Sequence, residues 1–390
     1  LRNVAAASGV RSKLYPAGMP QMNEAVIVDT VRTPIGKRKG ALATWHPADL
    51  LGFTLKALLD RNDVDPGRID DVVGGCVNQV GEQSNNVARN AWIGAGLPWH
   101  VPATSVDRQC GSSQQAAHFA AQGVMAGAYD VVVAAGVEVM SLVPMGASIG
   151  SGVGFPFGAA YDRYADVELI AGHKGLVGQG VSAEIIANEW GLSREDLDAY
   201  GARSQALAEQ ATAEGRFENE IIPVVSKIRD KESGEIKVLD TMVTTDEGIR
   251  PGTTAEGLAK LKPSFLPEGK VTAGNSSQIC DGASAALIMS ADKAAALGLT
   301  PRARFHTFAL AGVDPVRMLT GPIPATAKAL EKSGLGIDDF DHIEVNEAFA
   351  SVVLAWEKEH HPDMVKVNAN GGAIALGHPL GGSGTKLMAT

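Results

Sequence analysis

The sequence predicts an α/β fold in which a largely parallel sheet carries helices on both of its faces. Strand and helix signals alternate from residue 22 onward, and several strands are nearly continuous apolar runs. Such runs are typical of parallel strands that are buried on both faces. The 390 residues are 45% hydrophobic and 20% charged, which indicates a globular protein with a large core and about two to three domains.

The first alternating run occupies residues 22–140. Strands are expected at 25–29, 71–77, 103–106 and 129–136, and helices at 50–62, 86–94 and 112–127. The run at 129–136 is almost wholly apolar, so both of its faces are expected to be buried. The repeated strand–helix order favours parallel pairing, because parallel neighbours need a crossover connection.

The alternation stops after Met140. Residues 141–270 are rich in glycine and proline, with one clear helical stretch at 193–213 and a charged cluster at 229–235 that is typical of a surface hairpin or loop. We interpret this segment as an inserted lid. A strand at 283–290 follows.

A second alternating run comes after this strand and predicts a duplicated unit. Strands are expected at 303–311, 343–345 and 365–370, and helices at 324–333 and 347–360. The predicted division is an extension at 1–21, a first half at 22–140 and 271–300, a loop domain at 141–270, and a second half at 301–390 that looks truncated.

Charge and cysteine content narrow the class of protein. A net charge of −10 argues against a nucleic-acid partner. The three cysteines are widely spaced and form no CxxC pair, which argues against structural zinc and indicates a reducing compartment such as the cytoplasm. No apolar run approaches the ~20 residues of a membrane helix. Residues 1–21 are basic and could alternatively be a mitochondrial presequence.

Cys110 is the most informative residue. It stands in V-D-R-Q-C-G-S-S, where a short apolar strand turns into a helix of small residues. The positive end of the helix dipole and the free N–H groups of the first turn favour the thiolate, the reactive form of cysteine. Far downstream, G-G-A-I-A-L-G-H-P is expected to place His378 at a glycine-rich strand end. A cysteine paired with a distant histidine is typical of nucleophilic catalysis, although a lone cysteine is more often a small buried hydrophobe.

Several of these strings, in this order, resemble the thiolases. They are R-T-P-I-G from Arg32, the string around Cys110, V-T-A-G-N-S-S from Val271, N-E-A-F-A from Asn346, and the string that ends at Pro379. The resemblance covers the chain from about residue 22 to its end. It implies two duplicated βαβαβαββ halves in a layered α-β-α-β-α arrangement, with a loop domain inserted in the first half. It also implies acyl transfer between a thiol and coenzyme A, which joins or splits a 3-ketoacyl chain.

The resemblance also implies roles for individual residues. Cys110 is expected to be the nucleophile that holds the acyl group as a thioester, and His378 to be the base. His378 and Asn346, the latter through a water, are expected to form one oxyanion site. The residues expected to bind coenzyme A are Arg250, Ala273, Ser276, Ser277, Ala348 and Phe349. Coenzyme A and acyl-CoA are then substrates, no separate cofactor or metal is expected, and the family forms homodimers or homotetramers.

Some alternatives remain open at this level. The family has a second cysteine in a Cys-x-Gly motif after the histidine, but no cysteine follows His378, so we expect the natural chain to continue beyond Thr390. Residues 179–184 resemble the degradative branch, which favours fatty-acid or steroid side-chain β-oxidation over biosynthetic acetyl-CoA acetyltransferase activity. A condensing ketoacyl synthase, which pairs its cysteine with two histidines, and a thiolase-like acyl-CoA binding protein without turnover are the other candidates.

Overall fold

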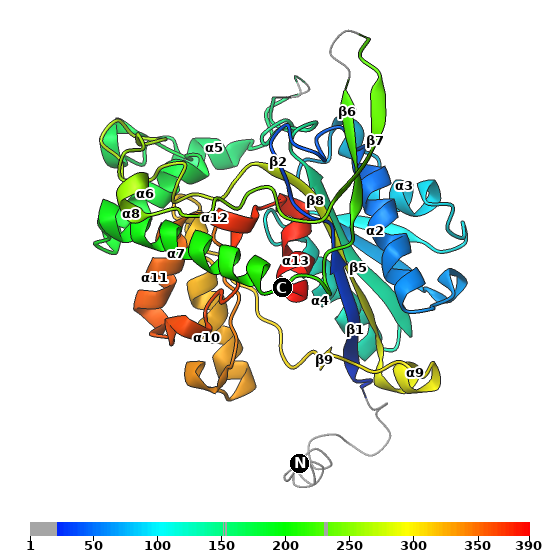
Figure 1. The fold of residues 1–390 in the computed structure, drawn as a ribbon. Coiled ribbons are helices and arrows are strands. Elements are labelled where there is room, and N and C mark those ends of the chain that lie inside the picture. Colours follow the sequence, from blue (N-terminus) through cyan, green and yellow to red (C-terminus); the bar gives the residue numbers. More distant parts are fainter. Residues whose placement is uncertain (1–21, 151, 153, 230–232) are drawn as a thin grey trace.

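A seven-stranded sheet organises the first part of the chain in the computed structural model, which describes residues 22–150, 152, 154–229 and 233–390 (Figure 1). The strands run in the order β4-β3-β5-β8-β1-β9, and the short β2 pairs with β8. Their bounds are β1 Ala25–Arg32, β2 Gly36–Lys37, β3 Asp71–Gly75, β4 Ala103–Val106, β5 Val131–Val139, β8 Cys280–Ser290 and β9 Ala303–Arg304. The predicted extension at 1–21 lies outside the described residues.

The sheet is mixed, so the prediction of a largely parallel sheet holds only for β4-β3-β5. Strand β3 is parallel to both of its neighbours, whereas β5–β8, β8–β1 and β1–β9 are antiparallel. Helical crossovers connect the three parallel strands. The insertion lies between β5 and β8 in the sequence. Because no single helical crossover joins these two strands, they need not be parallel.

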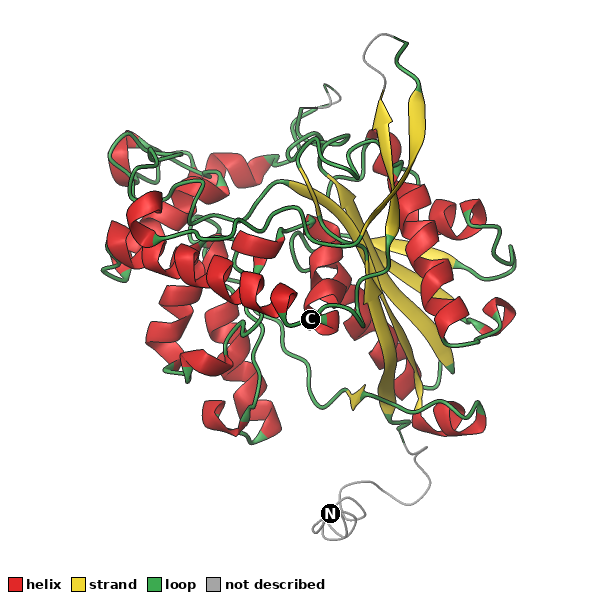
Figure 2. Cartoon of the chain, in the orientation of Figure 1, coloured by secondary structure: helices red, strands yellow, loops and turns green. Residues whose placement is uncertain are grey.

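Helices cover both faces of this sheet (Figure 2). Helices α2 (Pro47–Arg61) and α3 (Val87–Gly94) share one core with alternate residues of β5, among them Val133. Helix α4 (Ser112–Met125) packs on the opposite face against Val132 and neighbouring residues. Helix α13 (Ser383–Ala389) comes from the far end of the sequence, yet it contacts α4, β1 and β8. Residues 131–136 of the apolar run expected at 129–136 are therefore buried on both faces, whereas Tyr129 is half-buried and Asp130 exposed.

The segment 141–270 adds no strand to this sheet among the described residues. It contains the hairpin of β6 (Val224–Arg229) and β7 (Ile236–Val243), and helices α5 (Ala159–Tyr164), α6 (Gln179–Glu189), α7 (Arg194–Ala213) and α8 (Ala255–Leu258). The hairpin was expected at the charged cluster, of which residues 230–232 lie outside the described residues. Helix α6 was not expected. Its residues 180–187 are all buried, so no polar face marks it as a helix in the sequence.

The C-terminal segment keeps its predicted helices but not its predicted strands. Its helices are α9 (Ala291–Ala296), α10 (Pro322–Ser333), α11 (Ala350–His360), α12 (Ala373–Leu376) and α13. The strands expected at 343–345 and 365–370 are reduced to one parallel bridge, Ile343 with Val367, and the strand expected at 303–311 is reduced to β9. Strands form only where neighbours pair with them, and the described residues offer these two segments no further partner.

The insertion and the C-terminal segment share a second core. Helices α6 and α7 pack against α11 beside the main sheet (Figure 1). Buried side chains of this core include Ala183, Leu197, Val353 and Trp356. The insertion is thus attached to the segment that carries Asn346 and His378.

Candidate active site

Cys110 is displayed on a tight turn between β4 and α4. Gln109 has a φ of 48°, a left-handed conformation that side chains other than glycine rarely adopt. Side chains lock the turn: Asp107 Oδ1 accepts from Gln109 N at 2.7 Å, and Ser112 Oγ accepts from Arg108 N at 2.9 Å. Helix α4 begins at Ser112, so Cys110 lies two residues before the helix rather than in its first turn.

The environment of Cys110 keeps its thiol protonated. Burial is the largest effect and raises its pKa to about 11, and the charges of Glu138 and Asp107 raise it further. Hydrogen bonds from the Gln179 side chain and from its own N–H oppose this rise. Burial therefore opposes the thiolate that a helix start would favour.

His378 lies in the loop between α12 and α13 and not at a strand end, as had been expected. Its Nδ1 is 2.5 Å from Ser383 Oγ, which itself donates to Pro379 O at 3.0 Å. The hydroxyl proton is thus engaged, so Nδ1–H is the donor to Ser383. The other nitrogen, Nε2, lies 3.3 Å from Asn346 Nδ2 and accepts from it. This tautomer leaves a lone pair on Nε2, which a general base requires.

His378 is a neutral imidazole in this environment. Burial is the main cause of a pKa lowered to about 3, and the positive charge of Lys386 lowers it further. A neutral imidazole and a protonated thiol are thus the stable forms at neutral pH. The chemistry then needs proton transfer from Cys110 to a base during the reaction.

The start of α13 packs directly on the start of α4 and so joins the two catalytic segments. Thr385 N donates to Ser113 Oγ at 3.1 Å. A Cβ on Gly384 would lie 2.0 Å from Gln114 N, so only glycine permits this approach. The loop that carries His378 is thereby fixed against residues that follow Cys110 in the sequence.

Asn346 has one side-chain atom that is buried without a partner. Its Nδ2 contacts His378, but no described protein atom donates to its Oδ1. Unsatisfied buried polar atoms are rare, and at a candidate site they mark a position for a water or a substrate group. This placement suits the expected role of Asn346 in an oxyanion site that includes a water.

Four of the six expected coenzyme A residues form one wall. Ser277 N donates to Ala348 O at 3.0 Å, and Ser276 pairs with Phe349 as an isolated antiparallel bridge. The wall is apolar at this point, because the Phe349 ring meets that of Phe265 edge to face at 5.9 Å.

The other two expected residues, Arg250 and Ala273, are exposed. Gln205 Oε1 accepts from the backbone N of Arg250 at 2.8 Å, and Gln205 Nε2 donates to Ile374 O at 3.3 Å. Gln278 Nε2 likewise donates to Gly248 O at 2.8 Å and to Ile374 O at 2.9 Å. Two glutamines therefore tie the Arg250 loop to the His378 segment.

Sequence reasoning assigned no role at the site to five of its residues: Gln179, Gln205, Gln278, Glu138 and Glu347. Glu347 was expected inside the helix at 347–360, and this was wrong. Helix α11 begins at Ala350, and Glu347 is fully buried with its carboxylate engaged by other segments. Three of the five had a usable signal: Glu347 stands in the string from Asn346, Gln179 begins the segment 179–184, and Gln278 directly follows the string that begins at Val271.

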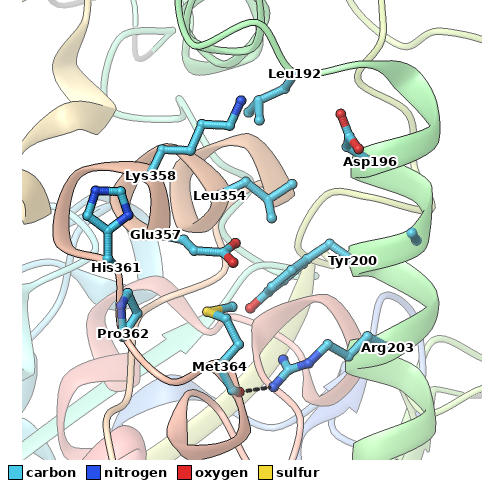
Figure 3. A pocket seen from close by; sticks show the side chains of 11 residues that line it. Leu192, Asp196, Tyr200, Arg203, Leu354, Glu357, Lys358, His361, Pro362 and Met364 are labelled. Atoms are coloured by element: carbon cyan, nitrogen blue, oxygen red, sulfur yellow. Dashed lines mark hydrogen bonds between the residues drawn. The ribbon is translucent and has the colours of Figure 1, made fainter. Parts of the chain in front are cut away.

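A groove of about 670 Å³ lies between α7 and α11 (Figure 3). Tyr200 and Arg203 line it from α7, and Leu354 and Lys358 from α11. None of the predicted site residues lines this groove, so it offers no support for their roles.

Metal clusters and membrane-spanning helices are both absent from the described residues. No group of three or more His, Cys, Asp or Glu side chains there is placed to hold a metal ion. No helix in that part of the chain combines the length and the hydrophobicity that a membrane crossing requires.

The residues gathered here are those expected for acyl transfer through a cysteine, and comparisons with known proteins give the family. A family model for the thiolase N-terminal domain matches residues 25–292, and one for the thiolase C-terminal domain matches residues 299–390. The chain belongs to the thiolase family. This excludes the ketoacyl synthase alternative and confirms the predicted fold class.

Similar proteins are found among curated sequences and solved structures. The steroid 3-ketoacyl-CoA thiolase FadA6 of Mycobacterium tuberculosis is 48% identical over 376 residues, covering 95% of this chain and 87% of the relative. A 3-ketoacyl-CoA thiolase of Bacillus subtilis is 45% identical, covering 94% of this chain and 91% of the relative. The crystal structure of the Bacillus anthracis acetyl-CoA acetyltransferase superposes with a TM-score of 0.80 at 36% identity, covering 95% of this chain and 92% of that chain.

Proposed function

We propose that this thiolase splits 3-ketoacyl-CoA substrates with coenzyme A, in fatty-acid or steroid side-chain β-oxidation. The observation that carries the proposal is the contact between His378 and Asn346, together with the bond from Thr385, after His378, to Ser113, after Cys110. The names of its relatives support the substrate class, since proteins named 3-ketoacyl-CoA thiolase match it at 45–48% identity.

The proposed reaction proceeds through a thioester on Cys110. His378 Nε2 takes the thiol proton as the sulfur attacks the 3-keto carbon, so a carbon–sulfur bond forms. The bond between C2 and C3 then breaks, and C2 leaves as acetyl-CoA after it gains a proton. The thiol of a second coenzyme A attacks the thioester and gives up its proton to His378. The bond from the acyl carbon to Cys110 then breaks, Cys110 takes the proton from His378, and the shortened acyl-CoA is released.

Asn346 and His378 would stabilise the negative charge that develops on a carbonyl oxygen. Donors placed in advance at such a site typically contribute ~10²–10³ in rate. In this proposal, the imidazolium formed in the first step is the acid that supplies the proton gained by C2.

Coenzyme A would lie along the wall of Ser276, Ser277, Ala348 and Phe349. A narrow pantetheine arm suits small and apolar side chains. Arg250 is exposed and free to meet the nucleotide end, because a guanidinium can stack on adenine and attract phosphate. We propose that coenzyme A and acyl-CoA are the only small molecules required and that no separate cofactor or metal takes part.

We also propose that the chain forms a homodimer, or a pair of dimers, through β4. Among the described strands, β4 pairs only with β3, so its other edge is free, and its residues are half-buried or exposed. Phe119 on the adjacent α4 is 44% exposed. A second copy that pairs at this edge would brace the turn of Cys110 and would bury at least ~2,000 Å² if the dimer is obligate. Light scattering on dilute protein tests this, and an active single chain would contradict it.

We also propose that the protein works in a reducing compartment. All three cysteines are free in the structure, which supports a reducing compartment such as the cytoplasm.

A thiolysis assay with purified protein tests the proposed function. Coenzyme A is supplied with 3-ketoacyl-CoA substrates that range from acetoacetyl-CoA to long linear and steroid-derived chains, and loss of the ketoacyl thioester is followed. We expect turnover with long or steroid-derived chains. Activity confined to acetoacetyl-CoA would favour the acetyl-CoA acetyltransferase alternative, which the Bacillus anthracis structure supports. Binding without any turnover would favour an acyl-CoA binding protein.

A further inference from the structure

We propose that two buried carboxylates, Glu347 and Glu138, are positioning residues that hold the His378 segment from its two sides. Glu347 binds a backbone N–H four residues before His378, and Glu138 binds one three residues after it. The proposal deepens the proposed function and rests on it where activity is the readout. Neither residue was identified from the sequence as part of the site.

Glu347 gathers donors from three segments. Its Oε1 accepts from Tyr200 Oη at 2.9 Å and from Asn368 Nδ2 at 3.1 Å. Its Oε2 accepts from Ser204 Oγ at 2.6 Å and from Ile374 N at 3.1 Å. Tyr200 and Ser204 belong to α7, so this one carboxylate connects the insertion, the residue next to Asn346 and the start of the His378 segment.

Further contacts hold the same segments together. Ser204 Oγ also accepts from Gly372 N at 3.2 Å, and a Cβ on Gly372 would lie 2.2 Å from the Glu347 carboxyl carbon. In Figure 3, Tyr200 and Arg203 point from α7 toward Met364, and Arg203 Nη2 donates to Met364 O at 2.6 Å. Helix α7 is therefore anchored to this region at several points.

The geometry at Glu347 requires a carboxylate and excludes an amide. Each oxygen faces one nitrogen that can only donate: Asn368 Nδ2 for Oε1 and Ile374 N for Oε2. Asn368 cannot turn its amide around, because its Oδ1 accepts from Val345 N and its Nδ2 donates to Val345 O, both at 2.8 Å. A glutamine would place its NH₂ against one of these N–H groups in either orientation.

Glu138, on β5, must also be a carboxylate, and it holds the His378 segment from the opposite side. Its Oε2 accepts from Gly381 N and from Val77 N, both at 2.9 Å. Its Oε1 accepts from Asn78 N at 3.0 Å and from Gln83 Nε2 at 2.7 Å. Three of these donors are backbone N–H groups, so an amide at position 138 would again face a donor.

No cation balances either carboxylate among the described residues, since every partner of each is a neutral donor. Buried charges are costly unless hydrogen bonds replace water. One such carboxylate on each side of His378 fits a role in positioning His378 better than a role in stabilising the fold. A displacement of about 1 Å in a catalytic group can cost ~10² in rate.

The experiment compares Glu347→Gln and Glu138→Gln with a matched control, Asp29→Asn. Asp29 is also buried and accepts bonds from Arg61 and Asn62, but it contacts no catalytic segment. Amide hydrogen exchange is followed in a peptide that covers residues 371–384, together with kcat and KM for thiolysis. We expect both glutamine variants to exchange faster in this peptide, to lose kcat by about 10²-fold and to change KM by less than about threefold. The control should change none of these.

A double variant separates positioning from general damage. If Glu347 acts through His378, Glu347→Gln in a His378→Ala background should lose less than about threefold further activity. An equal loss in both backgrounds, or unchanged exchange at 371–384, would overturn the proposal. If the wild type shows no thiolysis, the proposed function fails, but the exchange result still decides whether the two carboxylates hold the segment.

If a glutamine variant does not fold, Tyr200→Phe and Ser204→Ala replace it. Each removes one donor and keeps the carboxylate. Partial loss of protection at 371–384 supports the proposal, and full protection contradicts it.

Discussion

The two catalytic segments of this thiolase are held in place by different physical means. Cys110 follows β4, at the edge of a sheet whose interior is fixed by apolar packing between α2 and α4. His378 lies in a segment without strands, where single polar side chains bind backbone groups. The Cys110 side should therefore resist single substitutions, whereas the His378 side should depend on a few hydrogen bonds. Substitutions on each side test this contrast.

The largest effect is expected for the nucleophile. Cys110→Ser should reduce thiolysis by at least ~10⁴-fold, because serine is close in size but is a far weaker nucleophile at neutral pH. The fold should persist, since the turn is locked by Asp107 and Ser112 rather than by the thiol. The thiolysis assay measures the loss of activity, and circular dichroism measures whether the fold persists. Substantial residual turnover would contradict the assignment.

A smaller but still large loss is expected on the other side. His378→Ala should lower kcat by about 10²–10⁴-fold, because it removes the base that faces Asn346. Alkylation of Cys110 by iodoacetamide at pH 8 should change little, since neither group is charged in the resting site. A strong fall in the alkylation rate would instead show that a Cys110 thiolate and a His378 imidazolium form an ion pair in the resting site.

The alkylation rate of Cys110 should increase about tenfold for each pH unit. Since burial raises the pKa of this thiol to about 11, the thiolate fraction grows with pH throughout the range below that value. The alkylation rate should rise steadily from pH 7 to pH 10. His378 adds no step near pH 6.5, because burial lowers its pKa to about 3. Mass spectrometry of the Cys110 peptide measures the alkylation rate. A rate that levels off near neutral pH would show that Cys110 is already a thiolate there and would contradict this prediction.

The smallest effect on activity is expected in the sheet. Val133 is fully buried on β5 opposite Leu287, and Val133→Ala should lower the free energy of unfolding by about 2 kcal/mol. Thiolysis should change by less than about twofold, because the cavity lies in the core shared with α2 and not at the site. Denaturant unfolding and the thiolysis assay give the two numbers. A loss of activity comparable with that of His378→Ala would remove the contrast between the two sides.

This contrast also explains what the sequence could predict. Strand β5 and helix α2 were predicted because packing in a core imposes a hydrophobic pattern on local sequence. Cys110 and His378 were found through short strings and family resemblance. The positions of the Glu347 partners could not be predicted, because they lie 21–147 residues away and no local pattern records such contacts. The burial of Cys110, which opposes the thiolate, likewise depends on the whole fold.

The central claim is that Cys110 carries the acyl group, and direct labelling tests it. The protein is incubated with acetyl-CoA, quenched in acid and digested, and each cysteine peptide is weighed by mass spectrometry. The account predicts one acetyl group on the peptide that contains Cys110, removable by added coenzyme A, and none on the peptides of Cys76 or Cys280, which are buried. An acetyl group on Cys76 or Cys280, or turnover without any acetylated cysteine, would contradict it.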